Sequence, residues 1–213
     1  MAKCAYLCGM SLITALEERF GKHRVREISN PLHSEQSLIF LYLELQVPVT
    51  ILMTNGLSDY TMPVLDKWKG REHTELFFCL PTYWDIDEHK DPNFSWTYEW
   101  IFKLEQFVRE KETWFGPGHT IPCGNPPAPI SANMKQEYLI FLDPIFTGDA
   151  LKPLNVAGKT VNFLSIVPIF GDELDYKMGK GTDKIVRKFV QRKVDERLDD
   201  YRYSVLRSRM IFW

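Results

Sequence analysis

The sequence predicts an α+β fold in which helices pack against a mixed or antiparallel β-sheet. Apolar runs typical of buried strands come in groups, and segments with helical spacing come singly between those groups. In a doubly wound fold a helix would follow nearly every strand, and this chain does not have that order. Of the 213 residues, 45% are hydrophobic and 25% are charged, so the composition allows one large core. We therefore expect residues 1–213 to form a single domain.

The first elements are expected to be a helix and a pair of strands. Apolar residues recur from Leu12 at four-residue steps, and Gly21 follows them as a helix C-terminal cap. Two nearly continuous apolar runs come next, at 37–45 and 47–54. They predict either two buried strands or one long bent strand interrupted at Pro48.

A turn, a strand and a helix follow. Residues 55–59 (NGLSD) are of the turn type, and 74–81 (TELFFCLP) has the pattern of a short buried strand that ends at proline. After a polar stretch, Ser95 is placed to cap a second helix. The apolar residues of this helix recur at three- and four-residue steps and are Trp96, Trp100, Ile101, Leu104, Phe107 and Val108.

The C-terminal half predicts two more strands, at 136–144 and 159–170, with a loop between them. Residues 172–174 predict a short helical turn, and Thr182 is placed to cap the longest helix of the chain. The end of the chain, 203–213, predicts either a strand or an exposed apolar tail. One face of the longest helix would present Ile185, Val186, Phe189, Val190, Val194 and Leu198.

Charge and cysteine content restrict the class of protein. A net charge of -2 and a pI near 6.2 do not favour binding of nucleic acid or of an anionic membrane by bulk electrostatics. No run approaches the roughly 20 apolar residues needed to cross a bilayer, and the N-terminal stretch merges into an amphipathic helix instead of a signal cleavage region. The cysteines lack a regular disulfide spacing, which favours a reducing cytoplasm. They are Cys4, Cys8, Cys79 and Cys123.

The segment 114–130, WFGPGHTIPCGNPPAPI, is either an active-site loop or a shaped turn between strands. His119, Cys123 and Asn125 are the side-chain types of a thiol protease. Such triads normally gather residues from distant parts of the chain on rigid elements, whereas these three share one short loop. The spacing therefore argues against catalysis here.

A structural turn explains the same segment better. Gly116 and Gly118 allow backbone angles that other residues avoid, and the proline between them fixes one angle. The chain is then expected to reverse direction before His119, whose ring would hydrogen-bond backbone carbonyls.

Metal and nucleotide sites are not predicted, and no cofactor is expected. Cys4 and Cys8 have no second Cys or His pair at a zinc spacing. Residues 88–90 (EHK) imitate the end of a metal-dependent nuclease site, but they lie in an acidic, proline-containing stretch that reads as a solvated surface. The segment 176–184 places glycines before a helix start without the spacing of a Walker loop.

The last helix carries cations near its start, and acids follow them. This order opposes the helix macrodipole. The surface is either a solvated outer face or a docking site for a charged partner; direct binding of DNA is a further alternative and would depend strongly on salt. The charged residues are Lys184, Arg187, Lys188, Arg192, Lys193, Asp195, Glu196, Asp199 and Asp200.

Four motifs occur together in the order and spacing of a known family. They are Thr54 to Asp59 with Met62, Glu75 to Trp84, Gly118 to Ile121, and Phe163 to Ile169. On these motifs the chain resembles the Suppressor of Fused domain family over roughly residues 37–200, as a compact single-domain member of the bacterial type. The resemblance implies an α+β domain without enzymatic activity that holds other proteins. For bacterial members it implies an immunity protein that neutralises toxins.

The resemblance also implies a binding edge. In the animal protein, which grips an extended peptide of a zinc-finger transcription factor, a tyrosine and an acidic residue after the GLSD turn lie at that edge. Tyr60 is the nearest match to the tyrosine, and Asp66 is a loose match to the acid.

The function expected from the sequence is occlusion of another protein by aromatic and acidic side chains. The acidic stretch 85–91 suits a basic target such as a nuclease toxin. The alternative is a metal-dependent or His-based hydrolase or nuclease that uses His119 or the carboxylates after Trp84; it requires a pocket where His119 meets a second titratable group. The expected partner-binding residues are Asp59, Tyr60, Asp66, Tyr83, Trp84, Asp85 and Asp87. The partner's identity, the oligomeric state and the role of 210–213 are not predicted.

Overall fold

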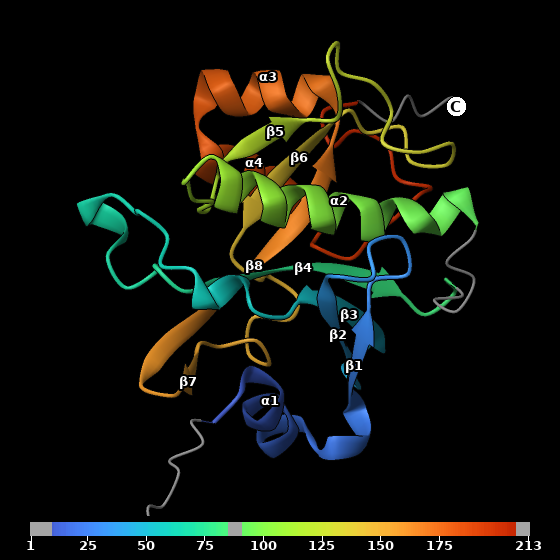
Figure 1. Ribbon diagram of the computed structural model, residues 1–213. Coiled ribbons are helices and arrows are strands. Elements are labelled where there is room, and N and C mark those ends of the chain that lie inside the picture. The colour runs from blue at the N-terminus through green and yellow to red at the C-terminus, as the bar shows by residue number, and fades with distance from the viewer. Residues whose placement is uncertain (1–9, 85–90, 208–213) are drawn as a thin grey trace, which may run out of the picture.

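The computed structural model describes residues 10–84 and 91–207 and has a β-sheet with helices on both faces (Figure 1). Within these residues the strand order is β1-β2-β3-β4-β8-β6-β5, and β7 pairs with β8 outside this path. Neighbours are antiparallel except β4 and β8, which are parallel. The predicted α+β class is confirmed. The strands are β1 (Val25–Ser29), β2 (Ser37–Leu43), β3 (Val49–Thr54), β4 (Thr74–Pro81), β5 (Thr120–Pro122), β6 (Tyr138–Leu142), β7 (Leu154–Val156) and β8 (Lys159–Ile169).

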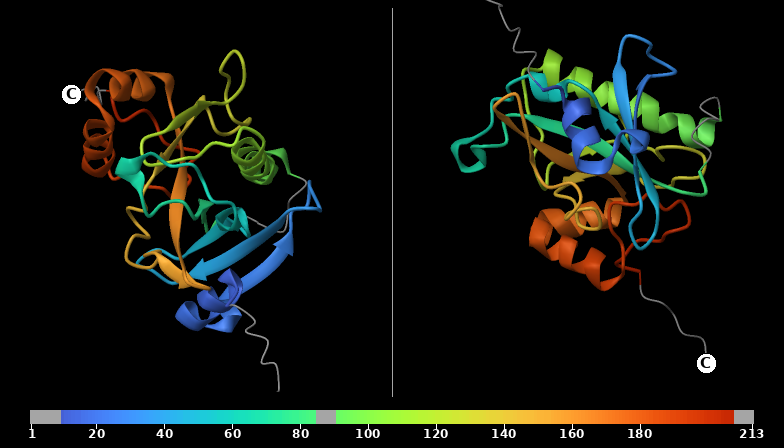
Figure 2. Two further views of the ribbon diagram at one scale, coloured as in Figure 1. Left: turned by 60° about the vertical axis from the view of Figure 1, so that its left-hand side comes forward. Right: turned by 90° about the horizontal axis from the view of Figure 1, so that it is seen from below.

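Helices cover the two faces of the sheet unevenly (Figure 2). The longest described helix, α2, packs on one face, where its apolar side chains meet those of β2, β4 and β6. On the other face, α1 covers the β2–β4 half and α4 covers the β6–β8 half. Because the central strands are buried on both sides, they read as continuous apolar runs without alternation. The helices are α1 (Leu12–Phe20), α2 (Pro92–Glu110), α3 (Gly171–Lys180) and α4 (Thr182–Gln191).

Several predicted elements lie where the sequence placed them. The predicted first helix is confirmed: Ser11 caps it by accepting a hydrogen bond from Thr14 N, and Gly21 ends it. The runs 37–45 and 47–54 form two antiparallel strands, β2 and β3, and not one bent strand. The strand predicted at 74–81 is β4, and the later two predicted strands contain β6 and β8.

Two helix boundaries were predicted wrongly. The cap of α2 is Asp91, whose carboxylate accepts a hydrogen bond from Asn93 N at 2.8 Å, so the helix begins before Ser95. Pro92 at the first helical position suits this start, because its missing N–H would have no partner there. Thr182 is the first residue of α4, and its N-terminal cap is Gly181.

The helix α4 also ends earlier than its apolar pattern predicted. Lys193 takes the left-handed conformation (φ 58°), and Val194 N donates to Phe189 O at 2.9 Å. This is the hydrogen-bond pattern of a Schellman cap, with lysine where glycine is usual. Leu198 therefore lies beyond the helix, and α2, not α4, is the longest helix among the described residues.

Three short strands and part of a helix were missed. Each missed strand, β1, β5 and β7, has five residues or fewer, and β7 lies in the segment predicted to be a loop. The helical turn predicted at 172–174 is the start of α3, which continues to Lys180. At the end of the chain, the described residues 203–207 form no strand, and 208–213 lie outside the described residues.

Candidate functional site

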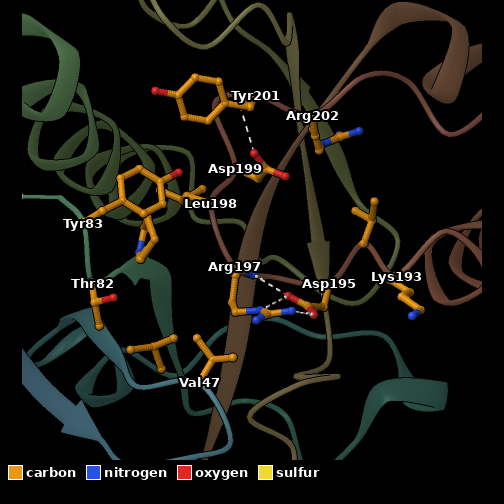
Figure 3. Close-up of a pocket in the computed structure, with 13 residues that line it drawn as sticks. Val47, Thr82, Tyr83, Lys193, Asp195, Arg197, Leu198, Asp199, Tyr201 and Arg202 are labelled. Carbon is orange, nitrogen blue, oxygen red and sulfur yellow. Dashed lines mark hydrogen bonds and ion pairs between the residues drawn. The ribbon is translucent and has the colours of Figure 1, made fainter.

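A cavity of about 350 Å³ opens beside the C-terminal end of β4 (Figure 3). One wall is formed by Val47, in the connection between β2 and β3, and by the residues that follow β4. The other wall is the chain segment 193–202, which follows α4. Residues far apart in the sequence thus form one concave surface, which we call the tyrosine groove. Its lining includes Val49, Pro81, Thr82, Tyr83, Lys193, Val194, Asp195, Arg197, Leu198, Asp199, Tyr201 and Arg202.

Backbone pairing fixes the segment 193–202 against the sheet. The first half of β4 pairs with β8, and beyond that half Leu198 N donates to Cys79 O at 2.9 Å. The segment therefore continues the sheet where β8 leaves β4. The buried Glu196 carboxylate accepts hydrogen bonds from Phe146 N and Thr147 N at 2.9 and 2.7 Å. A buried carboxylate must keep its hydrogen bonds. These contacts therefore hold the groove wall 193–202 against the backbone of residues 146 and 147.

Two exposed tyrosines mark the groove. Tyr83 is 57% exposed and Tyr201 is 79% exposed, and their ring centroids lie 6.5 Å apart. The Tyr83 hydroxyl donates to Asp200 Oδ1 at 2.6 Å, and Asn133 Nδ2 donates to the other oxygen of that carboxylate at 3.2 Å. Partial burial, followed by the contact with Asp200, raises the pKa of Tyr83. The phenol thus stays protonated and acts as a fixed donor.

Most charges of the groove are neutralised within the chain. Arg197 forms two hydrogen bonds with Asp195, at 2.8 and 2.7 Å, and its guanidinium lies 4.3 Å from the centroid of the Phe146 ring. Asp199 is exposed, and one of its oxygens accepts a hydrogen bond from Tyr201 N. Figure 3 shows the tyrosines close together on one side of the groove and Lys193 on the other. At the tyrosine side of the groove, the two aromatic rings thus lie beside the exposed carboxylate of Asp199.

The structure corrects the predicted role of Trp84. Its side chain is 5% exposed and packs in the core against Phe94 and Trp96, with centroid distances of 5.0 and 6.1 Å. Trp84 is therefore a core residue and not a contact for a partner, and its neighbour Tyr83 faces outward instead. Asp85 and Asp87 lie outside the described residues.

The predicted residues Asp59, Tyr60 and Asp66 lie at the opposite end of β4 from Tyr83. Asp59 ends a short 3-10 helix that precedes β4, and its carboxylate lies 3.7 Å from Lys159 Nζ. Tyr60 is half-buried against the core, and Asp66 is exposed on a second short helix. Eight residues of β4 span about 26 Å at roughly 3.3 Å per residue, so these side chains and Tyr83 do not form one site.

The segment 116–119 forms a tight turn. His119 N donates to Gly116 O at 3.0 Å, and Gly118 has a φ of 87°. A side chain at Gly118 would meet Thr182 Oγ1 at 2.5 Å, so only glycine allows this approach between the turn and α4. The His119 ring lies 4.4 Å from the ring of Trp114. The geometry is that of a packed connection into β5.

Among the described residues, His119 lacks the second titratable group that the catalytic alternative requires. Burial lowers the pKa of His119, against the effect of its contact with the Trp114 carbonyl. Within residues 10–84 and 91–207, no acid or thiol is hydrogen-bonded to this imidazole. Burial also raises the pKa of Cys123 to about 12, which disfavours the nucleophilic thiolate. Residues 88–90, the imitation of a nuclease site, lie outside the described residues.

In the described part of the chain, no three His, Cys, Asp or Glu side chains gather in a way that would hold a metal ion. None of the described helices is long and apolar enough to cross a membrane.

Part of the groove was not predicted from the sequence. Asn133 and Tyr201 were not named as binding residues, and Asp200 was named only among the charged residues of the last predicted helix. The clustering of acids with tyrosines at 199–203 was the available signal. Aromatic residues are enriched at recognition surfaces, but periodicity alone does not tell whether such residues are exposed.

The chain is similar to known proteins in sequence and in fold. The family described as Suppressor of fused protein (SUFU) matches residues 36–202. No curated protein sequence matches the chain. A chain in the crystal structure of the Sufu–Fu complex is similar, with a TM-score of 0.63 and 16% identity over 91% of this chain and 90% of that one.

Two further solved structures have the same fold. Drosophila Suppressor of Fused has a TM-score of 0.61 and 16% identity over 92% of this chain and 50% of that one, so the present chain spans half of the Drosophila chain. A SUFU homologue from Neisseria gonorrhoeae FA 1090 has a TM-score of 0.58 and 15% identity, and the match covers 92% of this chain and 96% of that one.

Proposed function

The chain belongs to the Suppressor of fused family, and from this premise we propose that it acts by binding another protein without catalysing a reaction. The tyrosine groove is the proposed binding surface. The observation that carries the proposal is the pair Tyr83 and Tyr201, two exposed rings on the two walls of the groove, of which the wall 193–202 is fixed by backbone hydrogen bonds. Exposed aromatic side chains held in place bury large areas with little loss of entropy.

The similar structures are consistent with this activity. One of them was solved as the complex of Sufu with Fu, so a chain of this fold is found in a protein complex. The groove also has the dimensions of a side-chain pocket, because about 350 Å³ accommodates one or two partner side chains beside the rings.

The partner that we propose is a basic protein, and immunity against a toxin in the bacterial cytoplasm is the proposed duty. In the sequence, the seven residues after Trp84 contain four acids and one lysine. Asp199 adds an exposed carboxylate beside the tyrosines. Acidic groups near an aromatic anchor attract a basic target and increase its rate of association, and the bound chain then covers the target's active surface.

The proposal is tested by co-expression with the basic proteins encoded beside this one. We expect Tyr83→Ala with Tyr201→Ala to abolish co-purification and protection of the host cell, because both anchor rings are removed. Asp85→Lys with Asp87→Lys should weaken binding most at low salt. The matched control is Leu32→Ala with Leu65→Ala, since both side chains are exposed and neither lines the groove.

Co-purification that survives the double tyrosine substitution would remove this groove as the binding surface. Turnover of a substrate by the purified chain, lost with His119→Ala, would overturn the non-catalytic proposal itself.

A further inference from the structure

A basic region on α3 and α4 is not used by the proposed function. Residues 177–193 contain seven cations and one acid, a net charge of +6. Since the whole chain carries -2, the remaining residues carry -8. The protein is therefore strongly polarised. The cations are Lys177, Lys180, Lys184, Arg187, Lys188, Arg192 and Lys193, and the acid is Asp183.

Helical spacing puts three of these cations on the outer side of α4. Ile185 and Phe189 are buried against β6 and β8. Lys184, Arg187 and Lys188 stand at steps of three and four residues on the outer surface, with Lys184 and Arg187 exposed and Lys188 half-buried. The burial of the apolar stripe thus orients the basic stripe toward solvent.

The acids that follow α4 in sequence do not neutralise it. Glu196 is buried and bound by the backbone of 145–147, Asp195 is paired with Arg197, and Asp200 accepts from Tyr83. Within the part of the chain that the structure describes, none of the seven cations forms an ion pair with a carboxylate. Most of the seven cations are exposed, whereas of the four acids at 195–200 only Asp199 is exposed.

Helix stability explains part of this arrangement. Lys177 and Lys180 in the last turn of α3 and Lys188 in the last turn of α4 suit the macrodipole, whereas Lys184 lies in the first turn of α4, where the macrodipole disfavours a cation. The lack of carboxylate partners among the described residues is the observation that is consistent with an external anionic partner.

From these observations we propose that the basic face, defined as Lys180, Lys184, Arg187, Lys188 and Arg192, binds an acidic segment of a protein. The proposal does not depend on the tyrosine groove. Two exposed apolar side chains, Met178 and Val190, are 69% and 57% exposed on the same two helices and offer contacts that a protein partner can bury.

The size and surroundings of the face favour a short segment over an extended polyanion. The ten residues of α4 span about 15 Å, which is the length of a short peptide segment of about three helical turns. DNA or an anionic membrane would extend beyond the face and meet the rest of the chain, which carries -8. A cavity of about 500 Å³ lies beside the C-terminal end of α4, and its lining includes Arg192, Lys193 and Arg207 together with Asp199 and Tyr201 of the tyrosine groove.

The test is binding of a fluorescein-labelled decaglutamate peptide to the full chain, followed by fluorescence anisotropy at low and physiological salt. We expect Lys184→Glu/Arg187→Glu/Lys188→Glu to weaken binding by about tenfold or more, because three attractions become repulsions. The matched control is Lys67→Glu/Lys69→Glu/Lys111→Glu, which changes the net charge equally at exposed sites on other elements and should change affinity by less than about twofold.

Equal weakening by the two triple variants would overturn the proposal, because bulk charge would then explain binding. Tighter binding of duplex DNA or of vesicles with anionic lipid than of the peptide would overturn the choice of partner. A glutamine series at the same three positions covers the case in which the glutamate variant fails to fold, and it should weaken binding in the same direction.

Discussion

At the residue scale, Glu75 shows how one buried carboxylate shapes the chain. Its side chain has no exposed surface and accepts hydrogen bonds from Gly56 N and Ser58 N at 3.1 and 3.0 Å, and from the Thr54 hydroxyl. The turn between β3 and β4 is thereby fixed to β4. Burial raises the pKa of Glu75 to about 7, although these hydrogen bonds act in the opposite direction. In the sequence, Glu75 is only the first residue of a family motif. Its structural role, which is to bind the turn after β3, is visible only in the folded chain.

The raised pKa of Glu75 predicts a specific pH dependence. The native carboxyl keeps its proton up to about pH 7, whereas in the unfolded chain it loses that proton near 4.5. Between these values the native state binds more protons, so this group lowers the free energy of unfolding as pH rises. We expect Glu75→Gln, which keeps the shape without the titration, to remove this contribution.

Urea unfolding at a series of pH values measures the effect as the difference between wild type and variant. Glu110→Gln, at an exposed position that ends α2, is the control and should leave the pH profile unchanged. Parallel profiles for wild type and Glu75→Gln would contradict the assignment.

At the element scale, one ion pair attaches the end of the chain to α3 and β8. Arg202 forms two hydrogen bonds with Glu173, at 2.8 and 2.9 Å, and a third with Pro168 O at 2.6 Å. The two side chains are 7% and 0% exposed. The Arg202 guanidinium also lies 4.9 Å from the centroid of the Phe170 ring. The tyrosine groove therefore depends on a contact made by a helix remote in sequence.

Removal of this arginine is expected to be costly. Arg202→Met leaves the Glu173 carboxylate buried without its cation, and loss of one partner of a buried pair costs about 3–5 kcal/mol. The same change at Arg24, whose partner Glu44 is exposed, should cost about 0–1 kcal/mol. The free energy of unfolding, measured in urea, compares the two. A cost at Arg202 no larger than that at Arg24 would show that the pair does not hold the segment.

At the scale of the whole molecule, β8 joins the three described hydrophobic clusters. Leu164 and Ile166 pack with the α2 side, Phe163 packs with the α1 side, and Val167 and Ile169 pack with α3 and α4. Each cluster is thus completed by the same strand. A shared central strand favours concerted unfolding over separate unfolding of the layers.

We propose on this basis that the chain is one domain, and we expect a single unfolding transition. Leu16→Ala, a fully buried change in α1, should cost about 2–5 kcal/mol. It should lower the urea midpoint seen by tryptophan fluorescence, although Trp84 and Trp96 report on the opposite face of the sheet. The same substitution should also reduce the hydrogen-exchange protection of the backbone amides in α4, because α4 is expected to unfold in the same transition. A tryptophan transition that stays unchanged would indicate separate domains or local unfolding of α1.

The sequence by itself determined the scaffold. Long apolar runs and the residues that end them are local patterns, set by neighbours within a few residues. Such patterns predicted the helix α1, the family motifs and the strands β2, β3, β4, β6 and β8. The short strands and the end of α4 at Gln191, two residues before the left-handed Lys193, could not be predicted, since they lack such local signals.

Only the tertiary structure decided which side chains face outward. Tyr83 and Asp200 are 117 positions apart and meet because the end of the chain returns to β4. Trp84 and Tyr83 are adjacent aromatic residues with opposite exposure. Three of the four acids after α4 are bound by other groups of the chain, and only Asp199 is exposed. Exposure and ion pairing depend on the whole set of packed neighbours, and a local pattern does not contain that information.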